Sequence, residues 1–575
     1  MNHSPGALEV LTTRVDELEK RVRALEHPAP ATATIQRSEP TINQPNASPS
    51  ALETGSFFPI IGRAMLGIAG AYVLRALAEL ATSSKLPISL FAVAYAFAWL
   101  VWSARTSSSM ARISYAATSV LVLAPMLWEN TLVFHVFKPM MAAGVLAAFL
   151  TLTTALDLRS DSVRGIWIAQ SVAAVITAAF AFRTREVLPF VTALLLAVLV
   201  SEFARTRRFA QPLWPLLVLV TDLSVCGLIF VYSGAPDTRA AYPHLSTAAL
   251  IVPASALFAL NGAALAVRVV AKETRITVLE MIQVVIAFAL TAIAILYFSP
   301  LRGPAVLGVT SIALSASAYF CAFRYLRCRD ERRSFRVFAI WSAALLVAGS
   351  LWALPRPFAA ILLALAAATA MYFSKRLEPE MLQFHGVLFL LTAGVLAGLP
   401  QYLYDCMAGT PPHSLSAPLV VLAMCAVAAV AISAPPLSDA WNQLLHLVPS
   451  LVAICGVTAF LVHGVLVAAG TFAGLEVQHI AFLRTLTICV TALAIAFGGS
   501  RLGRSALTHL AYIALAFLAA KLFFEDLRHG HMEFIAGSIG LFAITLMATP
   551  RLVRIGARRQ TGTSTAALHS KHLVP

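Results

Sequence analysis

The sequence predicts an all-α fold, a polytopic transmembrane helical bundle, and three observations support this class. The chain has 575 residues, of which 59% are hydrophobic and only 12% charged, and its mean hydropathy is +0.80. A soluble domain carries roughly a quarter charged residues, so this chain has too little polar surface to face water. Apolar runs of about 17–25 residues recur along it, and each is long enough to cross the hydrocarbon core as a helix that satisfies its own backbone hydrogen bonds.

The first element is a short heptad repeat over residues 1–26, which predicts a cytoplasmic coiled coil. Its apolar positions alternate in spacing between three and four residues: Leu8, Leu11, Val15, Leu18, Val22 and Leu25. Valine at a positions and leucine at d positions favour two parallel strands, and in this register Arg14 faces Glu19 of a partner chain. A homodimer through these residues is one interpretation. An amphipathic helix that lies on the membrane or on the protein itself is the other.

Three further segments complete the predicted organisation. Residues 27–56 are rich in Pro, Ala, Ser, Thr and Asn and lack apolar periodicity, which predicts a disordered linker. The transmembrane domain is expected over residues 57–549, and residues 550–575 are expected to form a basic, disordered tail. No apolar core follows a basic start at the N-terminus, so we expect no signal peptide. Neither end is long enough for a folded enzyme domain.

Apolar runs between charged or Pro- and Gly-rich breaks predict about eighteen spans, and about sixteen to nineteen would fit the same pattern. In chain order, the predicted spans are Phe57–Leu80, Leu86–Trp102, Ile113–Leu132, Met140–Leu156, Gly165–Phe182, Val187–Phe203, Pro212–Tyr232, Leu245–Val267, Ile276–Phe298, Pro304–Phe323, Phe335–Leu354, Pro357–Ser374, Met381–Leu399, Leu415–Ala434, Leu444–Ala469, Ile480–Phe497, Ala506–Phe524 and Glu533–Thr549.

Basic residues concentrate in alternate turns between these spans, which predicts the topology. If the N-terminus is cytoplasmic, the cytoplasmic turns hold roughly twenty Arg and Lys residues, against about eight in the other turns. Because cytoplasmic loops of membrane proteins carry the excess of basic residues, both termini are predicted to be cytoplasmic. The same placement argues against nucleic acid as a partner, which the net charge of +15 alone would suggest.

Ionisable side chains inside the spans are the candidates for function, because each costs about 2.5–3.5 kcal/mol on insertion scales. In the predicted topology they gather toward the outer face: Arg75, Glu79, Glu129, His463, Arg484, Lys521, Glu525 and Asp526. We expect them to line a polar vestibule that opens to this face. Taken singly, each also fits a structural ion pair or a side chain that extends to the lipid headgroups.

Asp222 differs from these residues, because it falls near the middle of the seventh predicted span with no charged neighbour in the sequence. Two interpretations are open: a hydrogen-bonded and protonated carboxyl between helices, or part of an intramembrane ion or proton path. Glu280 lies near the cytoplasmic end of its span and needs no functional account.

No catalytic or metal-binding motif stands out. The seven cysteines show no CxxC pairing, and His385, His446 and His479 lack metal-ligand spacing. The longest outer turn, residues 398–414, carries Tyr402, and tyrosines at this depth are typical of interfacial anchors. We therefore expect no cofactor and no metal, with membrane lipids as the immediate partners.

Two stretches resemble a known family. GRAMLGIAGAYVLRALAE (62–79) resembles the opening span of a bacterial family of multi-helix membrane proteins, domain of unknown function 2339, and AKLFFEDL (520–527), followed by a last span and PRLVR, resembles its closing signature. The resemblance implies a bacterial inner-membrane protein and a family role for Lys521 and Asp526. It implies no activity, and Arg75 departs from the more apolar form of the opening span.

Three functions fit these observations. The first is transport or handling of a lipid or cell-envelope precursor through the outer vestibule, since many spans, short loops and buried charges are what such a protein requires. The second is a non-catalytic scaffold that self-associates through the coiled coil. The third is a membrane-embedded transferase, for which only residues 398–414 offer a loop of sufficient length.

Overall fold

The computed structural model describes Glu19 and residues 49–80, 85–159, 166–207, 213–242, 245–327, 332–377, 379–407, 415–432, 440–470, 477–502, 505–527 and 531–571. The chain divides into two compact units, Met1–Ile60 and Ile61–Pro575. Apart from Glu19, the predicted coiled coil, with its homodimer contacts, lies outside the described residues, as does most of the predicted linker.

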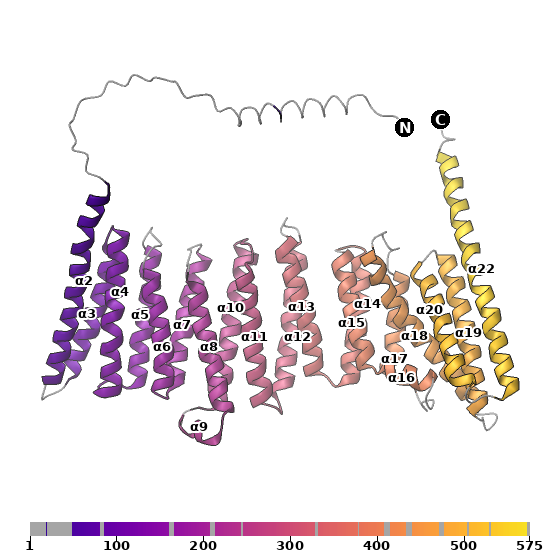
Figure 1. The fold of residues 1–575 in the computed structure, drawn as a ribbon, viewed down its shortest axis with the longest axis horizontal. Helices are drawn as coiled ribbons and strands as arrows, with labels where there is room; N and C mark the ends of the chain where they lie inside the picture. The colour runs from indigo at the N-terminus through magenta and orange to yellow at the C-terminus, as the bar shows by residue number, and fades with distance from the viewer. Residues whose placement is uncertain are drawn as a thin grey trace. The chain divides into compact units, whose positions relative to one another are not determined.

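The described elements are helices, and successive long helices run in opposite directions (Figure 1). They are α2 (Pro49–Leu80), α3 (Leu86–Arg105), α4 (Ser109–Trp128), α5 (Pro139–Arg159), α6 (Ile166–Arg183), α7 (Val187–Thr206), α8 (Trp214–Ser233), α10 (Thr247–Ala266), α11 (Val278–Phe298), α12 (Gly303–Cys321), α13 (Arg332–Ala353), α14 (Arg356–Ser374), α15 (Pro379–Leu396), α17 (Ala417–Ile432), α18 (Ala440–Gly470), α19 (Val477–Leu502), α20 (Ser505–Lys521) and α22 (Met532–Lys571).

Shorter elements occur at the ends of several spans. They are the helices α9 (Pro236–Ala240) and α16 (Leu399–Met407), and the π-helical turns η1 (Glu129–Val133), η2 (Val267–Ala271), η3 (Ala322–Leu326) and η4 (Leu522–Asp526). A π-helical turn bonds residue i to residue i+5 and so changes which side chains share a face of the helix.

The chain is a multi-pass integral membrane protein. Within the described residues, fifteen helices are long and apolar enough to span a membrane, or up to sixteen if the bent pair Glu380–Leu396 and Leu399–Met407 is one span. This number is lower than the predicted count of about eighteen, because two segments predicted as spans correspond to shorter apolar helices in the described part of the chain, Trp167–Arg183 and Ala417–Ile432.

Two helices extend into segments that the sequence predicts to be disordered. Helix α2 begins at Pro49, inside the predicted linker, and α22 continues to Lys571 across the predicted tail. Proline is well suited to a first helical position, and the Ala, Leu and Glu that follow it favour helix. Helix ends are therefore less well predicted here than the apolar segments between them.

The bend between α15 and α16 lies inside the long turn predicted at residues 398–414. The two helices meet at 60°, and Gly398 between them has a φ of +75°, which glycine adopts without steric cost. Residues 408–414, including His413, lie outside the described part of the chain.

Buried apolar side chains form two large clusters and a smaller one. The first extends from Ala96 to Ala294 and the second from Ala343 to Leu518. The smaller cluster lies where α10, α11, η3 and α13 meet, and it includes Val269 of η2 and Phe335 of α13. Val269 of this cluster directly follows Arg268 in the sequence, and Arg268 belongs to the ion network described below.

The crossing of α12 and α13 depends on two glycines. A Cβ placed on Gly308 would lie 2.3 Å from the backbone nitrogen of Ala353, and one on Gly349 would lie 2.8 Å from the carbonyl oxygen of Gly308. Small residues at such positions let transmembrane helices pack backbone to backbone.

Replacing Gly308 with alanine is expected to force α12 and α13 apart. Overpacking of this kind costs about 1–3 kcal/mol, so the free energy of unfolding measured by SDS titration in mixed micelles should fall by that amount. Gly262 of α10 is the matched control, since a Cβ there meets nothing within 4 Å, and Gly262→Ala should be neutral or slightly stabilising. Equal losses in the two variants would contradict this account of the crossing.

Candidate functional site

Lys521 lies buried at the junction between α20 and the π-helical turn η4. In an α-helix, residues five positions apart point about 140° away from each other. The i to i+5 bonding of a π-helical turn brings them to nearly the same face. As a result, Lys521 Nζ donates to Asp526 Oδ1 at 2.7 Å while it also lies 3.3 Å from Glu525 Oε2.

Helix α19 supplies the other partners of this ammonium group. Lys521 Nζ donates to the Ala481 carbonyl oxygen at 2.8 Å and to Thr485 Oγ1 at 2.7 Å. The Thr485 hydroxyl in turn donates to Asp526 Oδ2 at 2.7 Å. An ammonium group has three N–H donors, and here each has an acceptor.

Arg484 extends the same group of charges toward α16. Its Nη1 lies 2.9 Å from Glu525 Oε1, and its Nη2 donates to the carbonyl oxygen of Asp405 at 3.3 Å. Two cations therefore face two anions, and the contacts join α16, α19 and η4. We call Arg484, Thr485, Lys521, Glu525 and Asp526 the Lys521 cluster.

The Lys521 cluster contains half of the residues predicted for the outer vestibule. The side chain of Arg484 is only 3% exposed, that of Lys521 4% and that of Asp526 3%. Because three of its four charged side chains are buried and all four are paired, the cluster holds helices together and offers little accessible charge to a substrate. A vestibule lined by all the predicted residues stays a prediction.

Arg75, Glu79 and Glu129 form a second group, on α2 and η1. Arg75 Nε lies 3.2 Å from Glu79 Oε1 and Arg75 Nη1 lies 3.1 Å from Glu129 Oε1, so Arg75 pairs with both carboxylates. The side chains of Arg75 and Glu79 are 45% and 52% exposed, far more than those of the Lys521 cluster, whereas Glu129 is 16% exposed. We call these three residues the Arg75 group.

A cavity of about 230 Å³ lies between α2 and α4 beside the Arg75 group, and we call it the α2–α4 groove. Its lining is Ile68, Ala71, Tyr72, Arg75, Leu121, Val122, Pro125, Met126 and Glu129. The walls are apolar and one end is charged. Because Pro125 lies inside α4 and has no N–H, the carbonyl oxygen of Leu121 loses its usual helical donor.

Helix α2 is attached to its neighbours mainly by side chains. Tyr95 of α3 donates to the Gly67 carbonyl oxygen at 3.2 Å, and Arg63 donates to the Tyr115 hydroxyl of α4 at 3.3 Å. A Cβ on Gly67 would lie 2.7 Å from the Trp99 ring. Only 11% of this span is buried in the protein, so most of the surface of α2 faces lipid. The α2–α4 groove therefore lies at the lipid-facing side of the protein.

The remaining predicted residues lie elsewhere. His463 of α18 is buried, and its ring centroid lies 6.0 Å from that of Tyr402 on α16. Asp222 of α8 is also buried, and Gln283 of α11 donates to its Oδ1 at 2.9 Å. The contacts of Asp222 therefore join α8 and α11.

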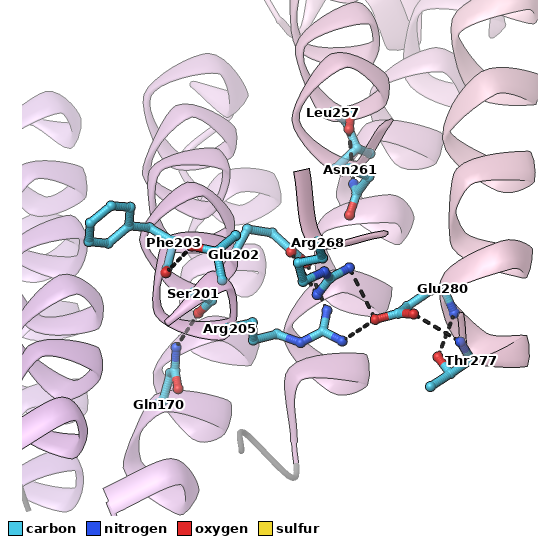
Figure 2. A network of polar contacts seen from close by, with 11 residues as sticks. Gln170, Ser201, Glu202, Phe203, Arg205, Leu257, Asn261, Arg268, Thr277 and Glu280 are labelled. Atoms are coloured by element: carbon cyan, nitrogen blue, oxygen red, sulfur yellow. Dashed lines mark hydrogen bonds and ion pairs between the residues drawn. The ribbon is translucent and has the colours of Figure 1, made fainter. Parts of the chain in front are cut away.

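A further ion network involves α7, η2 and α11 (Figure 2). Arg205 lies 3.0 Å from Glu202 and also contacts Glu280, while Arg268 lies 3.1 Å from Glu202 and 3.0 Å from Glu280. Each cation contacts both anions, so the four groups form a closed ring of alternating charge. The side chains of Glu202, Arg268 and Glu280 are 4%, 6% and 8% exposed. We call these four residues the ion ring.

Two local features position the ion ring. Thr277 and Glu280 form a reciprocal capping box at the start of α11, in which each side chain accepts from the other residue's backbone N–H, and this fixes the carboxylate. On the other side, the Arg205 guanidinium stacks over the Trp214 ring, 3.8 Å from its centroid.

Local sequence patterns place Glu280 near the end of its predicted span and Arg205 and Arg268 among the basic residues of the cytoplasmic turns, and they do not single out Glu202. One signal for it is present in the sequence, since Glu202 interrupts the apolar run of α7 three residues before Arg205. The partners Arg268 and Glu280 are distant in sequence, and nothing local indicates that they pair with Glu202.

Within the described residues, no three His, Cys, Asp or Glu side chains lie close enough together to hold a metal ion. No family model, no curated protein and no solved structure matches the chain.

Proposed function

We propose that this protein binds and handles a phospholipid, or a lipid-linked envelope precursor, whose headgroup carries both a phosphate and an amine. The lipid chain occupies the α2–α4 groove and the headgroup lies at the Arg75 group. One observation carries the proposal: the groove combines apolar walls with Arg75 and Glu129 at one end, and Arg75 also pairs with the exposed Glu79 beside it.

The groove suits an amphipathic ligand that enters from the bilayer. Ile68, Ala71 and Pro125 present apolar surface to a chain, while the rim residues Tyr72 and Leu121 are 64% and 59% exposed. The Leu121 carbonyl oxygen, freed by Pro125, is an acceptor for a hydroxyl or amine. Ligand sites are typically apolar pockets with a few placed polar groups, and this groove has that composition.

The charges of the Arg75 group favour a zwitterionic headgroup over a purely anionic one. Arg75 is the residue that suits a phosphate, because its planar guanidinium binds two oxygens at once. The Arg75 group carries one net negative charge, because Glu79 and Glu129 outnumber Arg75. The negative charge of a phosphodiester is therefore disfavoured there unless the ligand also brings a cation. An ammonium group next to the phosphate supplies that cation.

The depth of the Arg75 group agrees with a headgroup site. Arg75 lies about 7.5 Å along the axis from Leu80, the last residue of α2, at 1.5 Å per residue. This distance places its guanidinium near the boundary between acyl chains and headgroups. With both termini cytoplasmic, as the basic turns predict, the site faces the outer leaflet of a bacterial inner membrane.

Arg75→Gln is expected to weaken binding of phosphatidylethanolamine by about tenfold or more, because a charge-assisted hydrogen bond is worth about 1.5–3 kcal/mol. Native mass spectrometry of the purified protein, titrated with phosphatidylethanolamine, phosphatidylcholine and phosphatidylglycerol of identical chains, measures the change. Arg302→Gln is the matched control, since Arg302 is an exposed arginine in the turn before α12. Equal binding of phosphatidylethanolamine by Arg75→Gln and the wild type would overturn the proposal.

Glu129→Gln tests the amine half of the proposal separately. The wild type should prefer phosphatidylethanolamine to phosphatidylglycerol, and the variant should lose that preference while it retains affinity for the phosphate. A wild-type preference for phosphatidylglycerol would contradict the assignment of headgroup charge.

A further inference from the structure

We infer that Asp222 is a proton-binding site inside the membrane: its carboxyl group is held in the neutral form between α8 and α11. This site is distinct from the α2–α4 groove. It is carried by the position, burial and hydrogen bonding of Asp222.

The position of Asp222 excludes direct contact with bulk water in this structure. It lies about 12 Å along the axis from Trp214, the first residue of α8, at 1.5 Å per residue, and only 5% of its surface is exposed. Its neighbours in the sequence, Thr221 and Ser224, are 0% and 1% exposed, and their hydroxyls donate to carbonyl oxygens within α8.

The hydrogen bonds of Asp222 are too few for an ionised carboxylate. Gln283 Nε2 donates to Oδ1 at 2.9 Å, and the buried Oδ2 has no hydrogen-bond partner among the described residues. By contrast, Asp526 has a lysine on one oxygen and a hydroxyl on the other. The fold therefore provides cations for its other buried carboxylates and one neutral amide for Asp222.

The charged groups on the helices packed against α8 do not supply the missing cation. They are Glu202 and Arg205 on α7, Arg268 on η2, which follows α10, and Glu280 on α11. All four are already paired within the ion ring. Helix α6 has no ionisable residue before Arg183 at its end, and α9 at the far end of α8 carries Asp237 and Arg239.

An isolated carboxylate in apolar surroundings is unstable enough that the group normally takes up a proton instead. One neutral donor does not offset that cost, whereas the protonated acid accepts the Gln283 bond and carries no charge. Gln283 lies one helical turn beyond Glu280 of the ion ring, which is in the first turn of α11. A proton that enters at this end of α11 therefore has a short route to Asp222.

Carbodiimide labelling tests the protonation state in the full-length protein. Dicyclohexylcarbodiimide reacts with protonated carboxyl groups in apolar surroundings, so peptide mass spectrometry at neutral pH should find an adduct on Asp222. Labelling should decline as the pH is raised into the alkaline range, and Asp222→Asn should remove it. Protection by sodium chloride but not by choline chloride would overturn the proposal in favour of a sodium site.

Infrared spectroscopy makes the test independent of reagent access. The wild-type minus Asp222→Asn difference spectrum at neutral pH should contain the C=O stretching band of a protonated carboxylic acid. An ionised carboxylate band in its place would overturn the proposal. Asp526→Asn is the matched control, and it should remove a carboxylate band and no acid band, because Asp526 is paired with Lys521.

Discussion

The Asp526→Asn variant is expected to lose about 3–5 kcal/mol of its free energy of unfolding, the usual cost of removing one partner from a buried ion pair. The Lys521 cluster is neutral in the wild type, with two cations against two anions. Without the Asp526 carboxylate it holds one excess positive charge in a site where Lys521 is 4% exposed. SDS titration in mixed micelles, followed by loss of helicity, measures the change.

Two controls separate burial of charge from simple loss of contacts. Lys521→Gln combined with Asp526→Asn restores neutrality, so this double variant should be more stable than Asp526→Asn alone. Glu79→Gln removes a carboxylate that is 52% exposed, and its cost should stay below about 1 kcal/mol. If the double variant were less stable than the single one, the Lys521 cluster would not be held by charge balance.

The Glu202→Gln variant is expected to lower stability by a similar amount, about 3–5 kcal/mol. It leaves Arg205 and Arg268 to share the single carboxylate of Glu280, with the Arg268 side chain 6% exposed. Because the ion ring joins α7, η2 and α11, the loss should loosen all three elements together. Hydrogen exchange of their amides should accelerate along with the fall in unfolding free energy.

The double variant Glu202→Gln and Arg268→Gln keeps the pair of Arg205 and Glu280 and is neutral. It should be more stable than Glu202→Gln alone, although two substitutions normally destabilise a protein more than one. Arg207→Gln is the control, since this arginine is exposed at the same end of α7. Purely additive losses would show that the four charges do not act as a ring.

The sequence predicted the fold class well because length and apolarity alone decide whether a helix can cross a bilayer. Nearly every predicted span has a corresponding helix of membrane length. The differences occur at α6 and α17, which are short, at the bend around Gly398, and at Pro49 and Lys571, where helices extend into predicted disorder. Each depends on local backbone geometry that hydropathy does not describe.

The sequence singled out several of the charges that turned out to be buried, but it did not show how they pair. Hydropathy marks Lys521 and Asp526 as unusual in an apolar segment, yet their pairing depends on the π-helical turn η4. The ring of Glu202 with Arg268 joins residues on different helices. These partners are brought together by the packing of the helices, which the hydropathy and local pattern of one sequence do not reveal.

The central claim, that the α2–α4 groove binds a lipid through the Arg75 group, is tested most directly by photo-crosslinking in nanodiscs. The probe is phosphatidylethanolamine with a diazirine in its acyl chain, and adducts are mapped by peptide mass spectrometry. We expect adducts to concentrate on α2 and α4, relative to α12, of whose span only 28% is buried in the protein, and to decline in Arg75→Gln. Adducts spread evenly over the lipid-facing helices, and unchanged in Arg75→Gln, would contradict the claim.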